Sequence, residues 1–205
     1  MGLIYYCKLE FTILPPMIKK KKFTLSNILF AVFLVLLIIP QTRSRFQVAL
    51  NKVRVFVWSP SQLDQEDQTQ LHPFTYRLAT LDGMPTTLEI GKSKVTFISY
   101  WATWCPPCIA ELPSIEKLYA DYGDQIDFIL LTNEDPETVR KFLKKKSFNL
   151  PVYFPRMETP KALFERSIPT NYVLDKKGKI IIKETGAADW DSEKVRVVLN
   201  RLLTL

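Results

Sequence analysis

The sequence predicts one α/β domain over residues 73–205, built on a mixed sheet with helices on both faces. Strand-like and helix-like segments alternate along this stretch. Residues 95–101 are rich in β-branched and aromatic side chains, which indicates a buried central strand. The chain has 205 residues and 47% hydrophobic content, enough for one globular core. These observations exclude wholesale disorder.

The first half of the domain contains a hairpin, the central strand and a helix. Residues 74–78 alternate as a strand does, and Asp82-Gly83 predicts a turn into a second strand over 86–90. After the central strand, residues 106–121 show helical spacing. Pro113 lies inside that helix and is expected to kink it.

The second half continues the alternation of strands and helices and ends with a hairpin and a helix. The expected elements are a strand at 126–131, a helix with Asp135 as N-cap and Pro136 at its first position, a strand at 152–154, a helix at 161–166, strands at 171–174 and 179–183 joined by the turn 175–178, and a last helix capped by Asp191.

The N-terminal part contains a candidate membrane anchor. Lys19–Lys22 precede 17 uncharged residues, 23–39, which would form a helix about 25 Å long. Residues 40–45 lack a small-x-small cleavage pattern, so an uncleaved signal anchor is favoured over a signal peptide or a buried core helix. The lysine cluster favours a cytoplasmic N-terminus. We therefore expect a single-pass protein of the inner (cytoplasmic) membrane with its domain in the periplasm or another extracytoplasmic space.

Two flanking segments complete the predicted organisation. Residues 1–22 would be cytoplasmic, and translation is expected to begin at Met17, which would leave Cys7 and the rest of 1–16 untranslated. Residues 40–72 would form a juxtamembrane connector, with a short membrane-surface helix at 48–57 and a polar spacer at 63–70.

The charge distribution does not favour nucleic acid as a partner. The formal net charge is +7, but residues 73–205 hold 19 Lys+Arg against 17 Asp+Glu. The basic excess therefore lies outside the predicted domain, beside the apolar segment.

Cys105 and Cys108 are the candidate reactive groups, either as a redox pair or as half of a metal site. A zinc site needs about four ligands, and the chain offers no second cysteine pair and only one histidine, His72. We therefore expect no metal and no other cofactor beyond a Cys105–Cys108 redox disulfide. Cys105 stands where a strand ends and a helix begins, a place that stabilises a thiolate. Cys105 is expected to be the exposed nucleophile and Cys108 the resolving thiol.

Other residues are expected to frame the dithiol. Trp101 and Trp104 would bury one flank. Ile168-Pro169-Thr170 stands just before a predicted strand. A cis Pro169 would free the preceding backbone to pair with an extended substrate chain, whereas trans is the default for a loop proline.

The stretch from Val95 to Cys108, which ends in Tyr-Trp-Ala-Thr-Trp-Cys-Pro-Pro-Cys, resembles the active-site strand and helix of the thioredoxin superfamily. More narrowly, residues 73–205 resemble the membrane-anchored TlpA/ResA-like thiol–disulfide oxidoreductases. The Asp82-Gly83 hairpin, Glu111, Ile168-Pro169-Thr170 and the segment 186–190 all match. The resemblance implies a thioredoxin-like fold with an N-terminal β-hairpin and a central insert within 123–154, in which Pro169 is a cis-proline facing the dithiol.

One position departs from the thioredoxin pattern. Thioredoxins carry a buried acid six residues before the first cysteine, where this chain has Ser99. Glu111 matches an acid that the narrower family keeps near its site. Such a carboxylate would tune the thiol pKa and take the Cys108 proton, although an exposed helix glutamate is the alternative.

The sequence thus predicts a membrane-tethered thiol–disulfide oxidoreductase. Its catalytic residues would be Cys105, Cys108 and Glu111, with Trp104, Ile168, Pro169 and Thr170 binding substrate. The resemblance implies protein thiol clients, including apocytochromes c, and a membrane electron donor. A thiol peroxidase is one alternative, but Thr103 stands two residues before Cys105 rather than three. A metallochaperone or anchored binding module is another.

Overall fold

The computed structural model describes residues 24–38 and 40–204. The chain divides into two units at residue 39, and each is described by itself. The first contains α1 (Leu25–Ile38). Among the residues described, no helix is both long enough and apolar enough to cross a membrane. The predictions for residues 1–22, including the start at Met17, and for both ends of the 23–39 segment lie outside the described residues.

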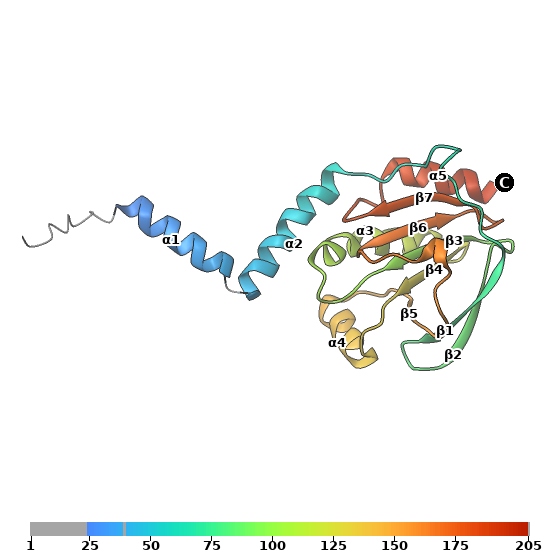
Figure 1. The fold of residues 1–205 in the computed structure, drawn as a ribbon, viewed down its shortest axis with the longest axis horizontal. Helices are drawn as coiled ribbons and strands as arrows, with labels where there is room; N and C mark the ends of the chain where they lie inside the picture. Colours follow the sequence, from blue (N-terminus) through green and yellow to red (C-terminus); the bar gives the residue numbers. More distant parts are fainter. Residues whose placement is uncertain (1–23, 39, 205) are drawn as a thin grey trace, which may run out of the picture. The chain divides into compact units, whose positions relative to one another are not determined.

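The second unit is built on a seven-stranded mixed sheet, as predicted (Figure 1). The strands run in the order β2-β1-β5-β4-β3-β6-β7; β3, β4 and β5 are parallel and the other neighbours antiparallel. Their bounds are β1 Phe74–Thr80, β2 Pro85–Ile90, β3 Val95–Tyr100, β4 Ile126–Leu131, β5 Val152–Pro155, β6 Thr170–Leu174 and β7 Ile180–Thr185. The predicted N-terminal hairpin and central strand are confirmed.

The three long helices of the domain share one face of the sheet, so the predicted cover of the other face by a helix is reduced to one short 3-10 turn. These helices are α3 (Pro106–Tyr122), α4 (Pro136–Lys146) and α5 (Glu193–Thr204), and all three contribute to one core cluster with β3, β4 and β5. The connections β3-α3-β4 and β4-α4-β5 step across the sheet in the same direction. Because such crossovers are right-handed, both helices fall on the same side.

The opposite face is covered by a short helix and by the segment before β1. The predicted helix at 161–166 is only a 3-10 turn, η1 (Lys161–Leu163). The predicted polar spacer is not free: Leu63 N donates to Ile181 O at 2.9 Å, and Leu71 N donates to Gly178 O at 3.0 Å. Leu71 and Leu163 belong to the second core cluster. The connector is therefore part of the folded unit.

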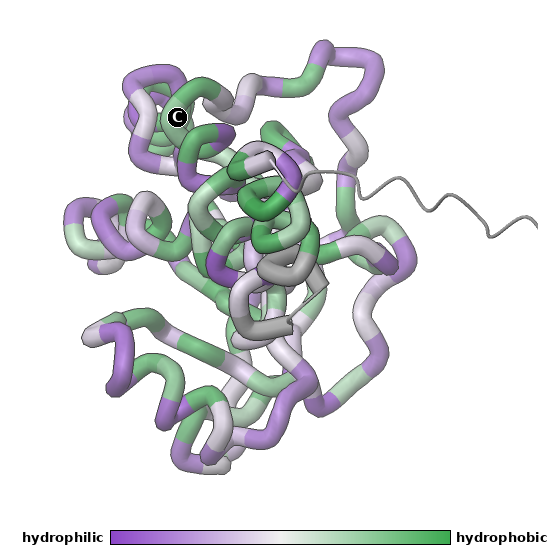
Figure 2. Tube along the Cα trace, turned by 90° about the vertical axis from the view of Figure 1, so that its left-hand side faces the viewer, coloured by the Kyte–Doolittle hydropathy of each residue, from purple (hydrophilic) through white to green (hydrophobic). Residues whose placement is uncertain are grey.

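The interior is apolar on both sides of the central strands. Figure 2 shows hydrophilic segments mainly along the outer loops and the outer parts of the helices. Val95 to Ser99 of β3 are all buried. The ring of Phe97 meets that of Trp190 edge-on with centroids 4.9 Å apart. This contact ties the central strand to the loop before α5, which matters for the site.

Helix α2 (Pro40–Val57) is longer than the short helix predicted at 48–57, and it packs against α3. The residue that follows it, Trp58, is hydrogen-bonded to the domain at two points. Its carbonyl accepts from Asp189 N at 2.8 Å, and its Nε1 donates to Glu184 Oε1 at 3.0 Å.

The sequence predicted the Asp135 cap and the 175–178 turn correctly, but it assigned the cap at Asp191 wrongly. Asp135 caps α4, because its Oδ2 accepts from Thr138 N at 2.9 Å. The 175–178 turn is closed by Asp175 Oδ1, which accepts from two backbone amides. Asp191 does not cap α5. Its carboxylate instead pairs with the guanidinium of Arg196, and the helix begins at Glu193.

Candidate active site

Cys105 and Cys108 form a disulfide at the start of α3, with an S–S distance of 2.04 Å. β3 ends at Tyr100, and a short loop brings the chain to Cys105, the N-cap residue of α3. The Cys105 sulfur accepts a hydrogen bond from Cys108 N at 3.2 Å. The predicted placement of Cys105 between strand and helix is confirmed. A negative charge on this sulfur would face the free amides of the helix N-terminus, which stabilise a thiolate.

Both cysteines are buried in the disulfide form. Cys105 is 2% exposed and Cys108 0%, so the expected exposure of Cys105 is wrong for this state. Trp101 is 3% exposed and packs within the same core cluster, as expected. Trp104 does not bury the flank as expected, since it is 68% exposed.

The Ile168–Pro169 peptide bond is cis, as the resemblance implied. Ile168 is half-buried against the core cluster that contains both cysteines. Pro169 O accepts from Gly186 N at 2.8 Å, whereas neither backbone group of Ile168 makes a backbone hydrogen bond within residues 40–204. The backbone just before Pro169 is therefore available to pair with another chain.

Thr170 differs from the expectation of a substrate-binding side chain. It is fully buried in β6, between Tyr100 of β3 and Thr185 of β7. Its hydroxyl donates to Ser167 O at 2.8 Å and lies 3.2 Å from the hydroxyl of Thr185. Thr170 thus orders the loop that presents Ile168 instead of facing a client.

Glu111 lies on the first turns of α3 and is only 1% exposed, which excludes the alternative of an exposed helix glutamate. Three donors surround its carboxylate. Asn171 Nδ2 donates to Oε1 at 2.9 Å, while Ala188 N and Trp190 Nε1 donate to Oε2 at 3.2 and 3.3 Å. The loop 186–190 and the first part of β6 therefore converge on this carboxylate.

Burial raises the pKa of Glu111 from 4.5 to about 8, because the charged form loses its hydration. The three hydrogen bonds act in the opposite direction and do not offset that effect. A carboxyl group that titrates near neutral pH is suited to accept and return a proton.

Ser99 is buried in β3 directly opposite Asn171 in the strand register. Its hydroxyl and Asn171 Oδ1 are buried without a hydrogen-bond partner among the described residues. Ser99 therefore adjoins the residue that binds Glu111, at the position where thioredoxins have an acid. Sequence reasoning missed Asn171, because nothing in the sequence connects it with a helix residue sixty positions earlier.

Glu134, just after β4, was also missed. Its Oε2 accepts from Thr103 N at 2.6 Å and its Oε1 from Thr103 Oγ1 at 2.7 Å. This paired contact fixes the loop between β3 and Cys105. No motif surrounds Glu134, so the sequence offered no signal for the contact.

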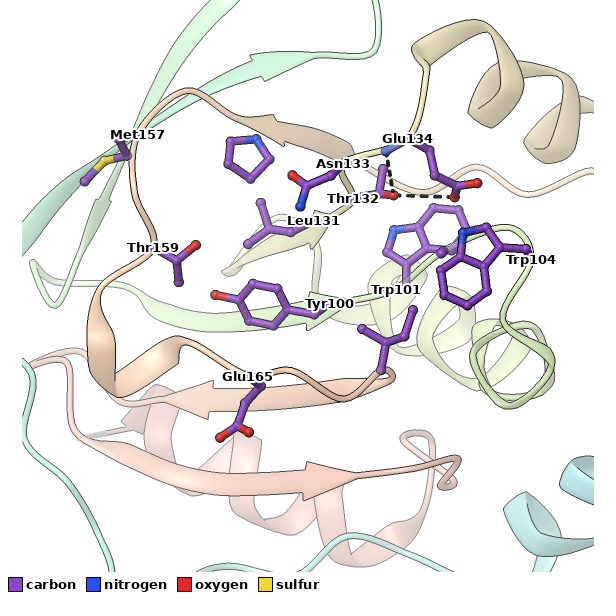
Figure 3. A pocket seen from close by; sticks show the side chains of 13 residues that line it. Tyr100, Trp101, Trp104, Leu131, Thr132, Asn133, Glu134, Met157, Thr159 and Glu165 are labelled. Carbon is purple, nitrogen blue, oxygen red and sulfur yellow. Dashed lines mark hydrogen bonds between the residues drawn. The ribbon is translucent and has the colours of Figure 1, made fainter.

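A cavity of about 460 Å³ adjoins the dithiol loop (Figure 3). Its walls include Trp101 and Trp104 from the loop before Cys105, and Ile168 from the loop before Pro169. Of the predicted substrate-binding residues, Trp104 and Ile168 thus meet at one cavity. No group of three or more potential metal ligands occurs in the described part of the chain.

The chain is similar in sequence to known proteins. The sequence pattern of the Redoxin family matches residues 66–200. The chain is 31% identical over 109 residues to the thioredoxin-like protein YneN of Bacillus subtilis, and 31% identical over 112 residues to the thiol-disulfide oxidoreductase ResA of Halalkalibacterium halodurans. These matches cover 51% and 53% of this chain, and 64% of each relative. The chain thus spans less than two thirds of either relative.

The fold is also that of a solved structure, a thiol:disulfide interchange protein DsbE from Chlorobium tepidum. The TM-score is 0.54 at 20% identity, and the match covers 66% of this chain and 98% of that one. This likeness confirms the thioredoxin-like fold.

Proposed function

This chain belongs to the Redoxin family, as a TlpA/ResA-like member of the thioredoxin superfamily, and we propose that it exchanges disulfides with protein clients through Cys105 and Cys108. The observation that carries the proposal is the disulfide at the N-terminus of α3, with Cys108 N donating to the Cys105 sulfur. The same amide would stabilise the Cys105 thiolate once the disulfide is reduced.

In the reducing direction, the Cys105 thiolate attacks one sulfur of a client disulfide. A bond forms between Cys105 and that sulfur, and the client's other sulfur leaves as a thiolate that takes up a proton. When the carboxyl of Glu111 is in its ionised form, it takes the proton of Cys108, and the Cys108 thiolate attacks the Cys105 sulfur. The client's second thiolate leaves, so two electrons have passed to the client and the Cys105–Cys108 disulfide is restored.

The loop before Pro169 would hold the client during both steps. The backbone groups of Ile168 make no backbone hydrogen bond in the part of the chain described, so an extended client segment can pair with them. Such pairing would keep the client sulfur near Cys105 without requiring a particular client sequence.

The location and partners complete the proposal. Residues 23–39 would anchor the protein in the cytoplasmic membrane, with residues 40–205 on the extracytoplasmic side. A membrane electron donor would reduce the disulfide again, and the clients would include apocytochromes c. A reduction potential near that of the strong oxidant DsbA, about −120 mV, would contradict this reductase direction.

Trapping tests the function directly. In Cys108→Ala the first step proceeds but the mixed disulfide is not resolved, so client proteins should accumulate on Cys105 and be identified by mass spectrometry after non-reducing separation. Cys105→Ala is the matched control and should trap at least tenfold less. Equal trapping by both variants would contradict the proposed roles. Consumption of hydrogen peroxide by the wild type, independent of Cys108, would favour the thiol peroxidase instead.

A further inference from the structure

The cavity beside the dithiol loop contains polar groups that the exchange reaction does not use. Figure 3 shows Glu134 and Trp104 at one end and Tyr100, with its hydroxyl toward Thr159, at the other. The hydroxyl of Tyr100 and Nε1 of Trp101 are both buried without a hydrogen-bond partner among the described residues. Both atoms are enclosed by the protein, so an occupant of the cavity would meet the more accessible lining groups instead, Glu134 and Trp104 among them.

The charge of the cavity favours a cation. Two of its lining residues are acidic and none is basic. The carboxylate of Glu165 points away from the cavity in Figure 3 and pairs with Lys183. Glu134 accepts only from neutral groups, and no lysine or arginine within residues 40–204 forms an ion pair with it. Its negative charge is therefore not offset locally.

The aromatic side chains that line the cavity also favour a cationic occupant. The indoles of Trp101 and Trp104 line the end of the cavity where Glu134 lies. A guanidinium or ammonium group is attracted to an aromatic face, and the attraction adds to that of a nearby carboxylate. Trp101 is buried, so the exposed indole of Trp104 is the aromatic face that an occupant would contact. The Glu134 carboxylate and this indole together fit a basic side chain.

We infer that this cavity is a specificity site that accepts an arginine or lysine side chain flanking the reactive cysteine of a client. The inference rests on the proposed function and names the class of client. A client whose sulfur is bonded to Cys105 and whose main chain pairs with Ile168 would lie beside this cavity, because Ile168 and Trp104 both line it. A neighbouring side chain of the client can then reach Glu134.

The rest of the domain would not produce the same preference. Residues 73–205 carry a small positive net charge, which by itself favours acidic peptides. A preference for basic peptides would therefore have to come from a local site.

Peptide exchange kinetics test the inference. The probes are three short peptides that carry one cysteine as a mixed disulfide with 5-thio-2-nitrobenzoate, flanked on both sides by arginine, by leucine or by glutamate. Reduced wild-type protein should release the coloured thiol about fivefold faster from the arginine peptide than from the leucine peptide, and slowest from the glutamate peptide. Cys108→Ala repeats the comparison for the first step alone.

A charge placed in the cavity should reverse this preference. Asn133 lines the cavity and is exposed, so Asn133→Lys should lower the ratio of the arginine rate to the glutamate rate about fivefold. Gln125→Lys adds the same charge at the opposite end of β4, on another exposed residue, and should leave the ratio unchanged.

The outcomes separate the two claims. Equal rates for all three wild-type peptides, or an equal change of the ratio in both lysine variants, would overturn the specificity site while leaving the exchange reaction intact. No release from any peptide would overturn the proposed function and the specificity site together.

Discussion

At the scale of single residues, Glu111 combines burial with hydrogen-bond donors and no cation. Asn171, Ala188 and Trp190 supply those donors, and none of the described lysines or arginines pairs with the carboxylate. Donors stabilise the charged form, whereas burial favours the neutral form. Because burial is the larger effect, the pKa is raised to about 8, and the carboxyl can change its charge during turnover at neutral pH.

The raised pKa of Glu111 predicts how stability depends on pH. Between pH 4.5 and about 8 the unfolded chain has lost this proton while the folded protein keeps it. The unfolded state binds fewer protons, so the free energy of unfolding falls as pH rises through this window. Its contribution is fully present below pH 4.5 and is lost above about 8.

Denaturant unfolding of the oxidised protein between pH 4 and 9 measures this effect. The wild type should lose on the order of a few kcal/mol relative to Glu111→Gln across the window. Glu193→Gln removes an exposed carboxylate from α5 and should keep the wild-type profile. Parallel profiles for wild type and Glu111→Gln would show that Glu111 ionises normally.

The same carboxyl should act in the resolving step. Glu111→Gln removes the proposed proton acceptor for Cys108, so decay of a preformed mixed disulfide on Cys105 should slow by about a hundredfold. Stopped-flow fluorescence or quenched mass spectrometry follows this decay, with Glu193→Gln again as control. An unchanged rate, together with an unchanged pH profile of the rate, would assign Glu111 a purely structural role.

At the scale of elements, the turn after β2 and the turn between β6 and β7 meet backbone against backbone. Gly91 has φ +75°, and a Cβ there would lie 3.1 Å from Gly178 Cα and 3.2 Å from Lys177 O. Gly83, in the β1–β2 turn, has a similar φ of +77° with nothing within 4 Å of a Cβ. An alanine at either position would therefore be strained to a similar degree, whereas only the one at position 91 would also crowd its neighbours.

Alanine at these two sites should separate strain from packing. Gly83→Ala should cost about 1–2 kcal/mol, the strain of a left-handed alanine. Gly91→Ala carries the same strain plus the displacement of the neighbouring turn, so it should cost about 1 kcal/mol or more beyond that. Urea midpoints compare the two variants. Equal losses of unfolding free energy in the two variants would mean that the turns at Gly91 and Gly178 can move apart without a further cost.

Elements were predictable from the sequence where the deciding contacts are local. The cap at Asp135 involves an amide three residues away, and the 175–178 turn closes on itself. Asp191 was assigned wrongly because Arg196 competes for its carboxylate. The face covered by α4 was also missed, since periodicity shows which side of a helix is buried but not which side of a sheet it covers.

At the scale of the whole molecule, the site is assembled from distant parts of the chain. The dithiol motif and Pro169 were visible in the sequence and are where the resemblance placed them. The environment of Glu111 depends on residues 60 to 79 positions away, and the contact between Glu134 and Thr103 spans 31. No pattern encodes such pairings, which arise only when the sheet brings β4, β6 and the 186–190 loop beside α3.

The division of the chain at residue 39 predicts that the exchange activity and the membrane attachment depend on different parts of the chain. Residues 40–205 form one compact unit that contains the dithiol, Glu111 and the cavity, and the family pattern begins only at residue 66. A fragment of residues 40–205 should therefore unfold cooperatively and reduce a soluble disulfide peptide within about twofold of the full-length rate, because no group of the exchange step is removed. The full chain should sediment with membranes and resist extraction by alkaline carbonate, whereas the fragment should stay in the supernatant, because only the full chain has the apolar segment 23–39. Release of the full chain into the supernatant by alkaline carbonate would contradict the proposed anchor. Loss of the exchange activity in the folded fragment would show that residues 1–39 take part in the reaction.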